Sequence, residues 1–174
     1  KSLGYKTKLI VCNAHANATK EQKQISELRV WASDQKVFQD DLIFTSQEGD
    51  EYKLGVKAKV VSDLFRISNV FIFPTVSENS SLVLMEAMLS GNLLVLNKKV
   101  GTLLEHAGQQ AIYFDFDYRE PQATNENYYL DLAKIIASQF EVQKPLQVKR
   151  RALQKNNFDY IFAHEIEPLF YSNE

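Results

Sequence analysis

The stretch from Asn69 to Gly91, NVFIFPTVSENSSLVLMEAMLSG, contains a strand, a loop and a helix from which the fold can be predicted. The continuous apolar run Val70–Phe73 predicts a strand that is buried on both faces. Pro74 ends this strand, because proline cannot donate to a central ladder. After a short polar loop, a helix is predicted over Ser81–Ser90, and Gly91 ends it where a glycine can adopt a positive φ.

Apolar runs of the same kind recur on either side of this stretch. They are short, rich in Val, Ile, Leu and Phe, and continuous rather than alternating: Leu9–Cys12, Leu42–Thr45, Leu93–Leu96 and Ala111–Phe114. Continuous apolarity is typical of parallel strands that are covered on both faces. Amphipathic stretches lie between the runs, so strands and helices alternate. The order predicts an α/β fold with a doubly wound, Rossmann-like parallel sheet, of which five strands are visible in the sequence.

The first predicted helix begins at a capping box formed by Thr19 and Gln22, and Ile25, Leu28 and Trp31 are expected along its inward face. This spacing of three residues places the three side chains on one side of a helix.

Two further helices are predicted between the later strands. Val56–Ser68 has four apolar residues on its inward side: Val60, Val61, Leu64 and Phe65. Thr102–Ala107 is short and ends at Gly108.

From about residue 127 to residue 174 the chain is predicted to form a helical tail. Tyr129, Leu132 and Ile136 form one apolar stripe, Pro145 suits the first turn of a helix, and Phe158–Tyr171 is a last amphipathic segment. A length of 174 residues favours a single domain over the whole chain, 1–174.

Composition and charge narrow the choice of partners. Hydrophobic residues make up 45% of the chain, charged residues 24%, and the net charge is −2, so nucleic acid is not an expected partner. No apolar run reaches the roughly 18–20 residues of a membrane span. The single cysteine, Cys12, lies in the run LIVC, and a lone buried thiol is typical of a reducing compartment. We therefore expect a cytoplasmic protein.

Two carboxylates mark the stretch from Ser77 to Gly91 as the candidate site. Loops at the carboxyl ends of parallel strands line the ligand crevice of doubly wound sheets, and Glu78 lies in such a loop. The amides of Ser80, Ser81 and Leu82 would begin the next helix, where unpaired N–H groups suit a phosphate. Glu86 lies in an otherwise apolar helix, where a buried charge needs a partner such as ligand hydroxyls. The alternative is that Glu86 is an exposed helix position and Glu78 a loop charge.

The same stretch resembles the C-terminal, donor-binding domain of retaining glycosyltransferases of the GT-B fold, which have a Glu-x7-Glu motif. In those enzymes the motif follows a strand that ends in Pro-Ser or Pro-Thr and enters an apolar helix closed by a small residue and glycine. The matching residues here are Phe73-Pro74-Thr75, Glu78, Leu82 to Met88 with Glu86, and Ser90-Gly91. Gly101 and Glu105 resemble the next Gly-x-x-x-Glu turn. The likeness extends from Leu9 to about Phe116.

The resemblance implies a role for each matched residue. Glu86 would accept hydrogen bonds from the ribose of a nucleotide-sugar donor, and Glu78, as the catalytic residue, would lie beside the transferred sugar. The amides of Asn79, Ser80, Ser81 and Leu82 would meet the sugar or the diphosphate, with Gly101 and Thr102 across the crevice. The reaction would transfer a glycosyl unit from a UDP-, GDP- or ADP-sugar to a hydroxyl acceptor with retention. It requires no metal and no cofactor, because dipoles and basic groups stabilise the leaving diphosphate.

The resemblance also implies parts that these residues do not include. Family domains open with a central strand that supplies an Arg and a Lys, and the acceptor site lies in an N-terminal domain. We therefore expect the chain to be a fragment of a polysaccharide-building enzyme, inactive alone, whose full form could associate peripherally with a membrane. Many members have Gly-Phe-Gly where this chain has Asn79-Ser80-Ser81, which favours an alternative, a non-catalytic module used for assembly or regulation. An epimerase on the same scaffold is a third reading.

Other chemistry-bearing residues are more simply explained by structural roles. His15, His106 and His164 are dispersed and show no metal-ligand spacing with Cys12. Lys98 and Lys99 precede Gly101 and could approach a diphosphate, although exposed loop lysines are the simpler interpretation.

Overall fold

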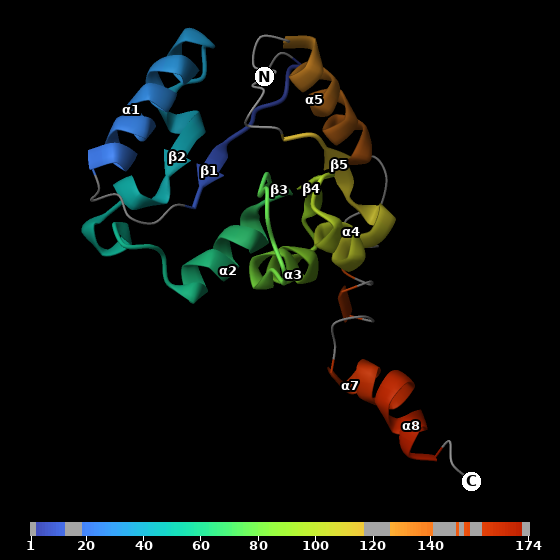
Figure 1. Cartoon of the computed structure of the whole chain (residues 1–174). Helices are drawn as coiled ribbons and strands as arrows, with labels where there is room; N and C mark the ends of the chain where they lie inside the picture. The colour runs from blue at the N-terminus through green and yellow to red at the C-terminus, as the bar shows by residue number, and fades with distance from the viewer. Residues whose placement is uncertain are drawn as a thin grey trace. The chain divides into compact units, whose positions relative to one another are not determined.

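The computed structural model describes residues 3–12, 19–116, 126–140, 149, 152–153 and 158–171 (Figure 1). Strands and helices alternate along the chain from the first strand to the fifth. The chain divides into two compact units, Lys1–Leu64 and Phe65–Glu174, and each is described by itself.

The first unit is built on two parallel strands. β1 (Leu9–Val11) pairs with β2 (Leu42–Phe44), with Leu9 opposite Leu42. α1 (Thr19–Asp34) connects them, and three short 3-10 helices follow at Gln39–Asp41, Thr45–Gln47 and Asp50–Tyr52. Four residues form its buried cluster: Ile25, Ala32, Leu42 and Phe44. α2 (Ala58–Ile67) leads from this unit into the next.

The inward face of α1 differs from the predicted one. Ile25 is buried, but Leu28 is 48% and Trp31 61% exposed, so the predicted stripe was wrong for both. The helix instead turns Arg29 toward the strands, where its guanidinium lies 5.2 Å from the centroid of the Phe44 ring. Nη1 of Arg29 also donates to the Leu42 carbonyl at 3.2 Å. The aliphatic stem of Arg29 and its cation–π contact allow this charged residue to pack against the strands, where the apolar pattern had placed Leu28 and Trp31.

Cys12 follows β1 and is exposed as a residue, so the expectation of a fully buried thiol was wrong, although partial burial of the thiol raises its pKa. The reason is that β1 itself is only partly covered, with Leu9 51% exposed.

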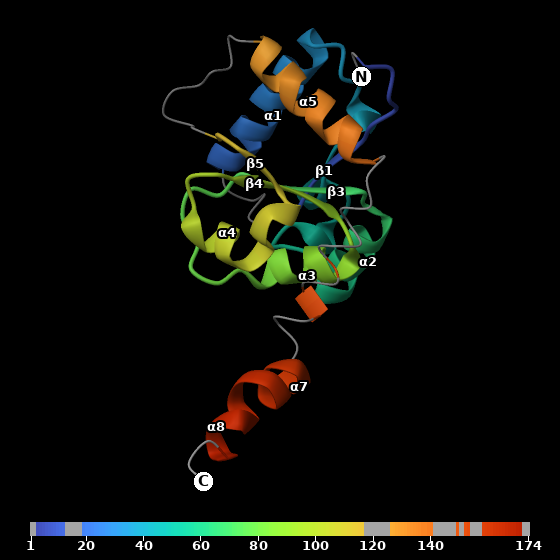
Figure 2. The same cartoon turned by 90° about the vertical axis from the view of Figure 1, so that its right-hand side faces the viewer.

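The second unit contains a sheet of three parallel strands in the order β3-β4-β5. β3 (Val70–Phe73), β4 (Leu93–Asn97) and β5 (Ile112–Phe114) lie in register with Phe73 opposite Leu96 and Val95 opposite Ile112. α3 (Leu82–Ser90) and α4 (Gly101–Ala107) cover one face, and α5 (Glu126–Phe140) covers the other (Figure 2). All five residues of β4 are buried, as expected of a central strand between two helical layers.

The core on the α5 side combines β4 and β5 with the helix. Leu132 of α5 joins a buried cluster with Leu93, Val95, Ile112 and Phe114, and Ile136 packs against it. Tyr129 was predicted to share this stripe but is 47% exposed. Tyr128 packs there instead, and its hydroxyl donates to the Asp115 carbonyl at 3.0 Å. The polar end of tyrosine thus finds a partner at the strand end while the ring is buried.

The fold is therefore α/β, with parallel strands that alternate with helices. Each predicted strand is present to within one residue at its ends, and the described α7 (Phe158–Ile161), π-helix Phe162–Ile166 and α8 (Glu167–Tyr171) follow the predicted last amphipathic segment. Pro145 lies outside the described residues. Among the helices that the structure describes, none is both long and apolar enough to cross a membrane. The predicted single domain stays a prediction.

Candidate functional site

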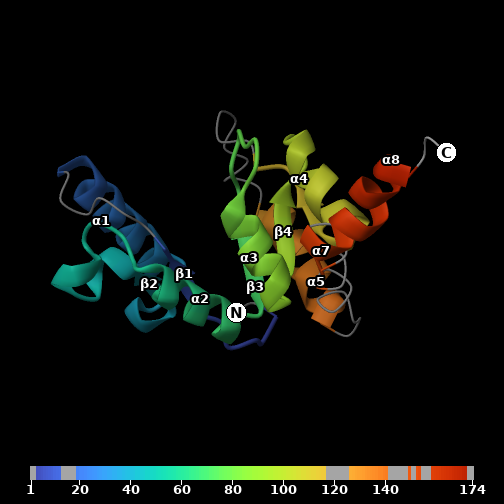
Figure 3. The same cartoon turned by 90° about the horizontal axis from the view of Figure 1, so that it is seen from below.

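The candidate site lies at the carboxyl ends of β3 and β4, which run side by side behind α3 (Figure 3). Because the strands are parallel, the loop after β3 and the turn after β4 emerge at the same edge of the sheet. This edge brings together residues from the two segments, Thr75–Ser81 and Asn97–Thr102.

α3 begins at Leu82, with Ser81 as its N-cap, one residue later than the predicted start. The Ser81 hydroxyl accepts from the Leu84 amide at 3.2 Å, and the first helical bond runs from the Met85 amide to the Ser81 carbonyl. The amides of Leu82 and Val83 therefore have no partner within the helix. Ser80 and Ser81, whose amides were expected to belong to the helix start, precede it. At the other end, Gly91 has the predicted positive φ, 80°.

Glu78 is half-buried in the loop, and hydrogen bonds engage both its carbonyl and its carboxylate. Its carbonyl accepts a 2.6 Å hydrogen bond from the Thr102 hydroxyl. Its carboxylate Oε1 accepts from the Asn79 amide at 3.0 Å. The Asn79 amide, which was expected to meet the donor, is thus already bonded to Glu78.

Glu86 is exposed on the outer side of α3, so the expected burial of its charge was wrong. It shares that side with Leu82 and Leu89, which are 77% and 43% exposed. The opposite side of the helix, made by Leu84, Ala87 and Met88, is fully buried. A helix that is apolar on nearly every side does not reveal from its pattern which side packs. The exposed carboxylate is accessible to a ligand from solvent.

Gly101 and Thr102 begin α4 at the same sheet edge. Gly101 is exposed, and a Cβ added there would meet no atom within 4 Å. Thr102 faces the β3–α3 loop through its bond to Glu78. The space beside Gly101 is therefore open, while Thr102 is engaged in holding the loop.

Asn97, the last residue of β4, was missed by sequence reasoning. It is only 1% exposed, its Nδ2 donates to the Thr75 carbonyl at 2.9 Å, and its Oδ1 accepts from the Lys99 amide at 3.1 Å. The available signal was an amide directly after the apolar run Leu93–Leu96. Polar residues at strand ends of a buried sheet need hydrogen-bond partners, which here are two loops.

Lys98 and Lys99 share the carboxylate of Asp115, at 3.2 and 3.1 Å. The hydrogen bond from Lys99 lowers the pKa of Asp115, burial partly opposes that change, and Lys98 lowers the pKa further. Both lysine side chains are about half exposed. The two lysines that could have approached a diphosphate are thus turned toward the end of β5.

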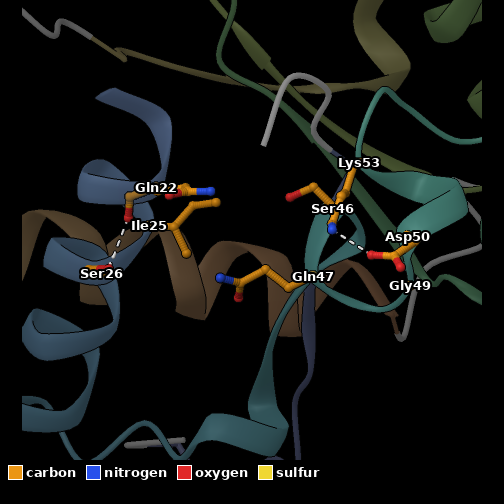
Figure 4. Close-up of a pocket in the computed structure, with 8 residues that line it drawn as sticks. All are labelled: Gln22, Ile25, Ser26, Ser46, Gln47, Gly49, Asp50 and Lys53. Atoms are coloured by element: carbon orange, nitrogen blue, oxygen red, sulfur yellow. Dashed lines mark hydrogen bonds and ion pairs between the residues drawn. The ribbon is translucent and has the colours of Figure 1, made fainter. Parts of the chain in front are cut away.

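A hollow of about 460 Å³ lies in the first unit and was not predicted (Figure 4). Gln22, Ile25 and Ser26 of α1 face it from one side, and residues that follow β2 face it from the other: Ser46, Gln47, Gly49, Asp50 and Lys53. Asp50 and Lys53 form an ion pair at its rim. The polar run Thr45–Asp50 after a buried strand was the same kind of signal that identified the loop at Glu78.

The two histidines that the structure describes, His106 and His164, lie apart in the chain's helices. His106 is half-buried in α4, and His164 stacks on Tyr160 with ring centroids 4.0 Å apart. His15 lies outside the described residues. Within the described ranges, no group of three or more His, Cys, Asp and Glu side chains is arranged to hold a metal ion.

No protein-family model matches the chain, and no curated protein matches it.

Proposed function

We propose that the second unit binds the nucleotide-sugar donor of a retaining glycosyltransferase at the carboxyl ends of β3 and β4. The observation on which the proposal depends is that Glu78, the start of α3 and the β4–α4 turn gather at one sheet edge through the bonds of Asn97 and Thr102 to the loop. Ligands of open α/β sheets bind outside the carboxyl ends of the strands. The unpaired amides at the start of α3 suit an anionic diphosphate.

In this proposal, Glu86 binds the ribose hydroxyls, because its exposed carboxylate has acceptor oxygens for two neighbouring O–H groups. The amides of Leu82 and Val83 meet the diphosphate, which moves the anion contact one residue along from the expected one. Glu78 lies beside the transferred sugar. During transfer, the bond between the sugar carbon and the diphosphate oxygen breaks and its electron pair stays with the diphosphate. A bond from the sugar carbon to the acceptor oxygen forms, and the proton of the acceptor hydroxyl goes to the leaving diphosphate.

The proposal includes a finer fold than the α/β class. The doubly wound order 3-2-1-4-5-6 without its first strand consists of a pair and a triplet of parallel strands. The described strands form a parallel pair, β1-β2, and a parallel triplet, β3-β4-β5. We therefore interpret the two sheets as parts of a Rossmann-like arrangement. An acceptor domain and a cytoplasmic location belong to the same proposal.

The second candidate is a non-catalytic module that keeps this scaffold for assembly or regulation. It is favoured by one observation, the hydrogen bond from the Asn79 amide to the Glu78 carboxylate, which engages both groups with each other. A donor sugar would have to displace this bond.

Calorimetric titration of the 174-residue chain with UDP, GDP and ADP tests the proposal. We expect one of the three to bind, and Glu86→Ala to weaken that binding by at least about tenfold, the loss expected for hydrogen bonds to a charged group. The matched control is Glu27→Ala, which removes another exposed helical glutamate, from α1 in the first unit.

Unchanged affinity in Glu86→Ala would rule out the ribose role. Failure of the chain to bind any of the three nucleotides would favour the non-catalytic module.

A further inference from the structure

We propose that Asn97 is the positioning residue of this site, because its single side chain holds the β3–α3 loop and the β4–α4 turn in one arrangement. The inference about loop geometry stands on hydrogen bonds of the chain itself. Its consequence for ligand binding rests on the proposed donor site.

The ladder between β3 and β4 ends at the residue pair before Asn97, and the Asn97 side chain bonds to the loop beyond it. The register of β3 and β4 runs from Val70 opposite Leu93 to Phe73 opposite Leu96, and the next residue of β3's chain is Pro74. Phe73 is therefore the last residue of β3 that is paired with β4, and Pro74 and Thr75 lie beyond the ladder. One residue further, the Thr75 carbonyl accepts from Nδ2 of Asn97 at 2.9 Å. A side chain from the end of β4 thus bonds to the β3–α3 loop beyond the last paired residue of β3.

The same amide also fixes the turn that follows β4. Oδ1 of Asn97 accepts from the Lys99 amide at 3.1 Å, and the Asn97 carbonyl accepts from the Val100 amide at 3.2 Å. A carboxamide has a donor and an acceptor in one plane, so one residue can bind a carbonyl on one side and an amide on the other. The two partners also fix which end of the amide is nitrogen. Aspartate or leucine cannot make both bonds.

Asn97 can position the site because its own backbone is held in the sheet. Asn97 is 1% exposed and is paired with Phe114 in the β4–β5 register, so its backbone is held by the sheet. Thr75 begins the loop that contains Glu78, and Thr102 ties the same loop three residues later, at the Glu78 carbonyl. The loop is therefore fixed at two points, of which Asn97 is the buried one.

Asn92 provides a matched control at the opposite end of the same strand region. It is also 1% exposed, and its Nδ2 donates to the Phe65 and Ser68 carbonyls at 3.0 and 2.6 Å. It therefore resembles Asn97 in residue type, burial and number of hydrogen bonds. Its partners lie at the amino end of the sheet: Phe65 is in the last turn of α2, and Ser68 is between α2 and β3.

The test compares Asn97→Leu with Asn92→Leu by amide hydrogen exchange of the whole chain, with Asn97→Ser as a milder variant if the leucine variant does not fold. We expect exchange at residues 75–81 to rise at least about fivefold in the Asn97 variant and to stay unchanged in the Asn92 variant, since two hydrogen bonds to the loops are lost. Thermal stability should fall to a similar extent in both. Equal exchange of the loop in the two variants would overturn the positioning role.

Nucleotide titration of the same proteins separates this inference from the proposed function. If UDP, GDP or ADP binds the unaltered chain, we expect Asn97→Leu to lower that affinity at least about fivefold and Asn92→Leu to leave it unchanged. Binding that is equally strong in Asn97→Leu would overturn the positioning of the site. If the unaltered chain binds none of the nucleotides, the proposed function fails, and the exchange result still decides whether Asn97 holds the loops.

Discussion

Asp115 is the residue whose charge depends most directly on its neighbours at the carboxyl ends of β4 and β5. Lys99 and Lys98 lower its pKa below the ordinary value of 3.8, so the ion pairs stabilise the folded chain above that pH. This contribution is lost as the pH falls from 3.8 through the lowered pKa. We predict that the Asp115 carboxyl titrates below 3.8 in an NMR titration, and that replacing both lysines by methionine raises its pKa.

The control for this titration is Lys134→Met, which removes an exposed ion pair with Asp131 on α5. It should leave the titration of Asp115 unchanged. Titration of Asp115 at or above 3.8 in the unaltered chain would contradict the prediction.

Residues of the site could be predicted where a local rule determines them. Glu78 and Thr102 follow parallel strands, so their approach at one sheet edge follows from the order of elements. The exposure of Glu86 could not be predicted, because α3 is apolar on nearly every side and only its packing shows which side is covered. Asn97 was missed because its two partners, Thr75 and Lys99, depend on the register of β3 and β4.

Helix α3 ends at a glycine in the left-handed conformation. Gly91 adopts φ 80° and ψ 28°, and its amide bonds back to the carbonyls of Ala87 and Met88. An L side chain is strained in this left-handed conformation, so we predict that Gly91→Ala lowers the free energy of unfolding by about 1 kcal/mol. Urea denaturation measures the change.

The comparison for that variant is Gly101→Ala at the start of α4. Gly101 does not adopt a positive φ, and the added Cβ would meet no atom within 4 Å, so the free energy of unfolding should change little. An equal loss of unfolding free energy in the two variants would mean that the left-handed conformation of Gly91 does not account for the effect of Gly91→Ala.

Strands were easier to predict than helix faces, for a physical reason. Runs such as Val70–Phe73 and Leu93–Leu96 are apolar on both sides, so each predicts a strand whichever side faces which layer. Burial on both faces was predicted correctly for Leu93–Leu96 but was wrong for Val70–Phe73, because Ile72 is 42% exposed. For α1, the spacing of apolar residues predicted the wrong inward face. Arg29 packs over Phe44 with its aliphatic stem, and Trp31 remains exposed.

The described part of the chain contains two parallel sheets, and the strands that pair in them are far apart in the sequence. Alternation of strands and helices predicts parallel pairing, because a helix between two strands returns the chain to the same end of the sheet. It does not determine which strands become neighbours. The division into β1-β2 and β3-β4-β5 therefore had to come from the structure. The interpretation of both sheets as one doubly wound arrangement is part of the proposed function.

The most direct test of donor binding at this sheet edge is an amide-detected NMR titration of the chain with UDP, GDP and ADP. We predict that one nucleotide shifts the amide signals of residues 75–86 and 97–102, where the loop, the start of α3 and the β4–α4 turn meet. Signals of α5, on the other face of the sheet, should remain in place. Shifts confined to other residues, or no shifts with any of the three nucleotides, would contradict the proposed site.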